Sequence, residues 1–285
     1  MKGILLLTSF VLLNANAYTQ LQSHTIYNSK GKKVSYKKMI KSIADDEIVL
    51  FGELHNNIIS HWYELEILKS LQEENKLGVG LEMFERDNEK AIQDYLNDSI
   101  DKKTFDLLVR QWNNYPTDYA PILEYCKSDS ISFHATNIPR RFANLIYKGD
   151  FSSLDTLNNE EKSWVAPLPI VYYDTLPQYK AILEMMGDHG TPSLVKAQAI
   201  KDATMAYFAL QVLNNENVDQ VLHLNGAFHS NYYEGIYWYI KHYSPKTSIS
   251  TITTVEQEDV NKLKGEHVGK ADFIIVVDKD FPTSY

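Results

Sequence analysis

Short apolar runs recur along the chain and predict buried strands. Four of them share one layout, because each is soon followed by a Gly, Asn or acidic residue: 47–51, 77–81, 130–133 and 220–224. Two later segments, 248–254 and 273–277, add similar runs. Short continuous apolar runs of this kind are typical of strands that are buried on both faces of a sheet. We therefore expect six strands.

Segments with helical spacing lie between these runs. In 60–75, apolar residues recur with charged residues on the other face, at Trp62, Leu65, Ile67, Leu68 and Leu71. Further helices are predicted at 87–98, 101–112, 119–128, 139–148 and 192–214. Strands that alternate with helices predict an α/β fold, with a mainly parallel central sheet flanked by helices.

Two segments depart from this alternation. Residues 154–190 contain Pro167, Pro169 and Pro177 and an aromatic run, and we expect a helical insertion or lid there. Residues 18–44 are polar and rich in Lys, and they are expected to form an N-terminal arm that leads into the first helix. The remaining chain, 45–285, is then a single α/β domain that includes the insertion.

The first residues have the pattern of a secretory signal peptide. Lys2 precedes an apolar stretch over 3–13, and the small residues of Ala15-Asn16-Ala17 close it. This stretch is too short to span a bilayer. We expect 1–17 to be a cleaved signal, no transmembrane span, and a periplasmic or secreted protein. Because no Cys follows the apolar stretch, a lipid anchor is not expected.

Charge and cysteine content exclude two classes of protein. The chain has 28 Lys and Arg against 37 Asp and Glu, a formal net charge of -9, and Lys and Arg never occur in a run longer than two. No nucleic acid partner is expected, because a polyanion needs a basic face. Cys126 is the one cysteine, so an intramolecular disulfide is excluded.

Ionisable residues follow the predicted strands. Glu53 and His55 come after the first run, Glu82 after the second, and His229 shortly after the fourth. Because ligands bind beyond the carboxyl ends of parallel strands, these four side chains are expected to converge there. Such a set suits a divalent metal with an open position, or an imidazole base beside an orienting carboxylate. A buried network with a purely structural role is the alternative.

Arg140 and Arg141 follow Pro139, a residue suited to the first position of a helix. Free backbone N–H groups and two guanidinium groups at a helix N-terminus could clamp a carboxylate or a phosphate. Surface ion pairs are the alternative for both arginines.

Tyrosine is abundant, with 19 residues, and several tyrosines cluster. Tyr232 and Tyr233 lie three and four residues after His229, so a phenol could face the same crevice. A phenol oxygen is an accepted axial ligand of ferric haem. Interior packing is the alternative for each of these side chains.

Together, the motifs over 45–277 resemble the ChaN-like haem-binding proteins of the wider Tiki and erythromycin-esterase-like group. The matching segments are Gly52-Glu53-Leu54-His55, Glu82-Met83-Phe84-Glu85-Arg86, Asn137-Ile138-Pro139-Arg140, 199–205 and 223–229. Their order and their placement at strand ends agree as well.

The resemblance implies an exported protein of haem and iron uptake, which holds haem at the strand ends. It implies a tyrosine as iron ligand, for which Tyr119 and Tyr233 are the candidates by position, beside His229. Arg140 and Arg141 would bind the propionates, two copies would pair around the haem, and an outer-membrane haem receptor would be a partner. The related hydrolases imply an alternative, in which Glu53, His55, Glu82 and His229 hold a divalent metal or activate water.

Overall fold

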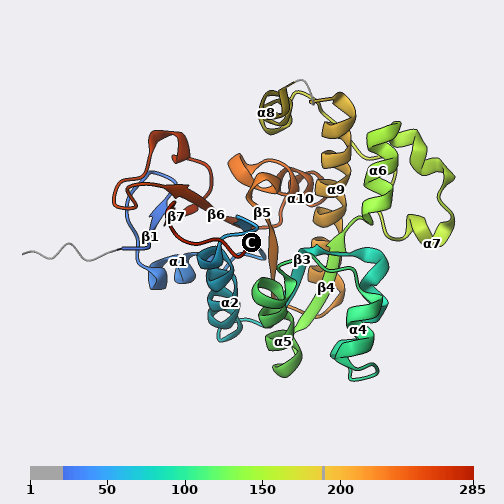
Figure 1. Cartoon of the computed structure of the whole chain (residues 1–285), viewed down its shortest axis with the longest axis horizontal. Coiled ribbons are helices and arrows are strands. Elements are labelled where there is room, and N and C mark those ends of the chain that lie inside the picture. Colours follow the sequence, from blue (N-terminus) through green and yellow to red (C-terminus); the bar gives the residue numbers. More distant parts are fainter. Residues whose placement is uncertain (1–21, 188–189) are drawn as a thin grey trace, which may run out of the picture.

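The structure is a computed structural model that describes residues 22–187 and 190–285. A seven-stranded sheet forms its centre, in the order β1-β7-β6-β2-β5-β3-β4 (Figure 1). All neighbouring strands are parallel except β1, which pairs antiparallel with β7 at one edge. The strands are β1 (His24–Asn28), β2 (Ile48–Glu53), β3 (Leu77–Glu85), β4 (Ser132–Asn137), β5 (Gln220–Gly226), β6 (Ile249–Gln257) and β7 (Phe273–Asp278). The predicted α/β fold is confirmed, and each of the six predicted runs overlaps a strand.

Helices cover both faces of the sheet, because alternate residues of a strand point to opposite sides. Val49 and Phe51 belong to one core, and Ile48 and Leu50 belong to the other. The first core is covered by α1 (Tyr36–Ile43), α2 (Ile58–Gln72), α3 (Glu89–Leu96), α4 (Lys102–Leu108) and α5 (Ala120–Ser128). The second is covered by α9 (Pro192–Asn215) and α10 (Ile236–Tyr243), which lie on the opposite side of the sheet from α2 and α5 in Figure 1.

The segment 154–190, for which a helical insertion is expected, is partly helical in its described residues. It contains the end of a 3-10 turn, Phe151–Thr156, then α7 (Asn159–Lys162) and α8 (Pro177–Met186). The segment packs on α9, together with the preceding helix α6 (Arg140–Lys148). Tyr179 and Ile182 of α8 are buried against Val195 and Ala199 of α9, so α8 is fixed beside the carboxyl ends of the strands.

The N-terminal segment is more than the arm expected over 18–44. Residues 24–28 form the edge strand β1, in which Ile26 and Tyr27 are buried. Ser35 caps α1 by accepting a hydrogen bond from the Lys38 backbone N–H, and Met39 and Ile43 enter the core. The apolar pattern missed β1 because backbone pairing with β7 defines this short strand.

The predicted signal peptide, 1–17, lies outside the described residues. In the ranges 22–187 and 190–285, no helix combines the length and the hydropathy that a membrane crossing requires.

Candidate functional site

The carboxyl ends of β2, β5 and β3 lie side by side, because β5 pairs with both other strands. Two adjoining hollows open there, of about 610 and 530 Å³. Both are lined by His55, Glu82 and Lys201, and we call them together the strand-end cleft. Their volumes fall in the range of small-molecule sites. The predicted convergence of strand-end residues is therefore present in the structure.

His55 is more exposed than His229. Its Nδ1 lies 2.7 Å from Glu53 Oε1, and 42% of its side chain is exposed. Burial lowers the pKa of His55, but the hydrogen bond to Glu53 and the charges of Glu53 and Glu82 together outweigh burial and raise this pKa. The carboxylate orients the ring, so in the neutral imidazole Nδ1 carries the proton and Nε2 carries the free lone pair.

His229 is held on both sides. Its Nε2 lies 3.1 Å from Glu82 Oε1, and its Nδ1 lies 2.5 Å from Asp202 Oδ1 on α9. Burial lowers the pKa of His229, but the charges of Glu82 and Asp202 outweigh this effect and raise it to about 9. Since both nitrogens face carboxylates, His229 is an imidazolium at neutral pH and offers no free lone pair.

Gly226 allows the strands to approach closely at the cleft. A Cβ atom at this position would lie 2.8 Å from both Cε1 and Nε2 of His55, and 3.4 Å from Glu82 Oε2. The Gly226 backbone N–H donates a hydrogen bond of 2.8 Å to the same Glu82 oxygen. A glycine is therefore required for His55 and Glu82 to occupy their positions.

The four predicted residues line one cleft but do not gather around one metal-sized point. Glu53, His55, Glu82 and His229 form two carboxylate–histidine pairs on neighbouring strands. Across the described ranges, the set whose ligand atoms come within 4.8 Å of one another is Glu53, His61 and Glu64.

Sequence reasoning missed His61, Glu64 and Asp202, which are all buried. Asn57 caps α2 with its Oδ1, which accepts from the Ile59 and Ser60 N–H groups, so His61 and Glu64 fall on the face turned toward β2. The sequence contains a signal for His61 and Glu64, because they recur with the same helical spacing as the buried apolar residues of α2.

Of the two arginines, Arg140 alone keeps its guanidinium free within the described residues. The Arg141 guanidinium forms an ion pair with Asp87, which is the surface alternative. Pro139 precedes α6 and is not its first residue, and the Arg140 backbone N–H donates 2.9 Å to Glu85 Oε2. The expected clamp of free N–H groups and two guanidinium groups is therefore reduced to the Arg140 side chain, which lines the cleft.

Neither predicted tyrosine opens its phenol to the cleft. Tyr119 is buried and donates 2.7 Å to Glu53 Oε1, and burial raises its pKa strongly. The Tyr233 hydroxyl donates 3.2 Å to Asp272, and burial raises its pKa as well. The turn of α-helix expected after His229 is replaced by a short 3-10 turn, Asn231–Tyr233, in which Tyr232 and Tyr233 have positive φ angles of 60° and 62° and redirect the chain.

One wall of the cleft is apolar and carries cations beside it. The apolar side chains come from α8, α9 and the turn after β5: Ile182, Met185, Met186, Leu194 and Phe228. Lys201 of α9 lines both hollows, and Arg140 lines the adjoining hollow. Within 22–187 and 190–285, neither cation forms an ion pair. An amphipathic anion matches this arrangement of apolar and positive groups.

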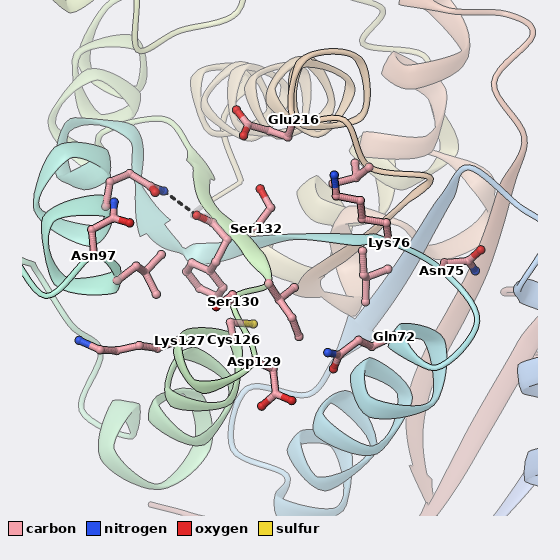
Figure 2. A pocket seen from close by; sticks show the side chains of 16 residues that line it. Gln72, Asn75, Lys76, Asn97, Cys126, Lys127, Asp129, Ser130, Ser132 and Glu216 are labelled. Atoms are coloured by element: carbon pink, nitrogen blue, oxygen red, sulfur yellow. Dashed lines mark hydrogen bonds between the residues drawn. The ribbon is translucent and has the colours of Figure 1, made fainter.

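A separate hollow of about 560 Å³ lies at the amino ends of the strands, opposite the strand-end cleft (Figure 2). It surrounds the beginnings of β3 and β4 and is lined by Gln72, Lys76 and Ser132. Figure 2 shows polar side chains around its rim, while Cys126 is buried and burial raises the pKa of its thiol. Because this hollow lies away from the strand-end residues, it is not part of the strand-end cleft.

A family model described as haem-binding uptake, Tiki superfamily, ChaN matches residues 39–240. The chain belongs to this family. The matched range contains β2, β3, β4 and β5 and therefore every strand end that lines the cleft. No curated protein sequence is significantly similar to the chain.

Solved structures share the fold at low sequence identity. ChaN of Campylobacter jejuni, in a structure of its cofacial haem binding, is 17% identical with a TM-score of 0.67, and the match covers 90% of this chain and 98% of that one. A Bacillus cereus protein is 10% identical with a TM-score of 0.53, covering 90% and 95%. These similarities show a common α/β fold for the ChaN family and its structural neighbours.

Proposed function

We propose that this chain binds haem in the strand-end cleft. The observation that carries the proposal is the apolar wall of α8 and α9 beside Lys201 and Arg140, two cations that form no ion pair within the described residues. Haem has an apolar macrocycle and two anionic propionates, so the wall would contact the ring and the cations would contact the propionates. Membership of the ChaN family and the haem bound by the Campylobacter jejuni relative support the same ligand.

His55 is the iron ligand that the geometry favours. Its Nδ1 is hydrogen-bonded to Glu53, which leaves Nε2 for the iron, and its ring lines both hollows of the cleft. A histidine held through its other nitrogen is the usual arrangement for metal-ligating imidazoles. Tyrosine ligation, which the family resemblance implies, would require Tyr119 to leave Glu53 or Tyr233 to leave Asp272.

Hemin titration of four proteins tests the ligand. The parent, Tyr119→Phe and Tyr233→Phe should give the same saturable Soret spectrum, and His55→Ala should bind hemin at least tenfold more weakly, with a changed spectrum. Loss of the oxygen-ligand bands in either Phe variant would assign that phenol to the iron and would refute His55. Circular dichroism of each variant establishes that its fold is retained.

A hydrolase is the second candidate, and one observation favours it. His55, oriented by Glu53, lies in the cleft beside the carboxylate of Glu82, as a general base would. His229 is unsuited to this role, because both of its nitrogens face carboxylates. Hydrolysis of esters or peptides that is lost in His55→Ala, in a protein that fails to bind hemin stoichiometrically, would establish the hydrolase instead.

Export, pairing of two copies and transfer to an outer-membrane receptor complete the proposal. They rest on the signal-like sequence of residues 1–17 and on family membership. Light scattering with and without hemin tests the pairing: the proposal expects the mass to double when hemin is added. An unchanged mass at saturation would refute the pairing and leave the binding intact.

A further inference from the structure

Behind His55 lies a buried group of acidic residues around a single imidazole. His61 Nδ1 lies 2.8 Å from Glu64 Oε2 and 3.3 Å from Glu53 Oε2. On the other side of the ring, Nε2 lies 3.5 Å from Asp118 Oδ2. All four side chains are at most 6% exposed. Three carboxylates therefore share one histidine in the interior.

The hydrogen bonds of His61 define which atoms need a positive partner. Nε2 lies 3.1 Å from the backbone oxygen of His55, and this oxygen and Asp118 are both acceptors, so Nε2 carries a proton. Nδ1 then faces carboxylate oxygens alone. An oxygen lone pair and a nitrogen lone pair repel one another, so a cation or a further proton must lie between Nδ1 and the two glutamates.

The glutamates also have oxygen atoms that accept no hydrogen bond. Within the described part of the chain, Glu53 Oε2 and Glu64 Oε1 are buried without a donor. With all groups ionised, the three negative charges of Glu53, Glu64 and Asp118 would face the two positive charges of His61 and His55, and no Lys or Arg of the described ranges pairs with them. Buried charge without compensation is costly, so one further positive charge, from a metal ion or a proton, would stabilise the cluster.

We propose that Glu53, His61 and Glu64 form a binding site for a divalent first-row metal ion such as Zn²⁺ or Mn²⁺. One ligand atom from each residue lies within 4.8 Å of the others, which suits a common metal ion. The His61 Nε2–H group on a backbone carbonyl supplies the outer hydrogen bond that ligating histidines normally have. One nitrogen with carboxylate oxygens is a ligand set for these metals.

Two features around Glu53, His61 and Glu64 are typical of a preorganised metal site. Tyr119 donates to Glu53 Oε1, and Asn114 donates 2.6 Å to Asp118 Oδ2, so the ligand Glu53 and the neighbouring Asp118 are both oriented. Asn114 directly precedes the π-helix Tyr115–Tyr119, and Tyr119 is its last residue. Isolated π-turns occur often at functional sites. The ion would fix Glu53 and, through it, His55, so it would organise the cleft while contacting no ligand in it.

Metal analysis of the whole chain tests this site without hemin. Protein stripped with a chelator is titrated with Zn²⁺ alone and with Mn²⁺ alone, and bound metal and melting temperature are measured. We expect one equivalent per chain and a higher melting temperature. Glu64→Gln should weaken metal binding at least tenfold. Its metal-free form should melt no lower than the parent, since the substitution removes a buried negative charge at constant shape.

His229→Gln is the matched control, because this buried histidine belongs to the other carboxylate pair. It should keep the full equivalent of metal. Loss of metal in His229→Gln with retention in Glu64→Gln would place the ion in the cleft and overturn the proposal. Absence of stoichiometric metal in the parent with both ions would overturn it as well, and a shared proton would then compensate the glutamates. Hemin binding in the parent is measured separately, so neither result depends on the other proposal.

Discussion

At the scale of single residues, the carboxylate partners decide which histidine has a free nitrogen. His55 contacts one carboxylate and keeps Nε2 free, whereas His229 contacts two and keeps none. The sequence placed both at strand ends but could not distinguish them, because the difference depends on Asp202 from α9, far along the chain. Tyr233 failed to reach the cleft for a similar reason, since the positive φ angles after His229 cannot be read from helical spacing.

The raised pKa of His229 predicts a defined dependence of stability on pH. The folded value of about 9 exceeds the ordinary value of 6.5, so the folded state binds the proton more tightly. The stabilisation is complete below pH 6.5 and is lost as the pH rises through about 9. The stabilisation of the folded state that is lost across this window amounts to roughly 3 kcal/mol. Denaturant unfolding on both sides of this window measures it.

His229→Gln is the control variant for this pH dependence. It should flatten the fall in unfolding free energy across the same window, because Gln does not titrate. A fall of equal size in the parent and in His229→Gln would contradict the assignment to His229.

At the scale of elements, the hydrophobic pattern predicts the strands that buried apolar side chains define. It does not identify polar residues that are buried on a helix. The runs over 77–81 and 220–224 became β3 and β5, each extended toward the cleft. In α2, the pattern included Trp62, which is 48% exposed, and overlooked the buried His61 and Glu64. Polar residues on a buried helical face are compatible with the fold only when partners from other elements satisfy them.

The N-cap of α2 predicts an element-level effect. Asn57 accepts hydrogen bonds from the Ile59 and Ser60 N–H groups and holds the turn that carries His61. Asn57→Ala should lower the unfolding free energy by about 1 kcal/mol, and it should also weaken metal binding. Asp101→Ala, at the exposed N-cap of α4, should cost a comparable free energy without affecting the metal. Equal metal affinity in both variants would show that α2 does not position the cluster.

At the scale of the whole molecule, the net charge of -9 opposes an anionic ligand, so local cations must attract it. Arg140→Ala should weaken hemin binding at low salt by about two- to fivefold and less at high salt, as expected for a partly screened contact. Arg141→Ala should change little, because its guanidinium pairs with Asp87. Dissociation constants at two ionic strengths measure both, and equal effects of the two variants would contradict the role of Arg140.

The central claim is that haem binds against the apolar wall of the strand-end cleft, and an absorption titration with hemin tests it most directly. The parent should show saturable, stoichiometric binding. Met186→Asp places a carboxylate on that wall and should reduce affinity at least tenfold, while Leu107→Asp, on α4 and 79% exposed, should bind like the parent. Unsaturable binding by the parent, or equal affinity of Met186→Asp and the parent, would contradict the account.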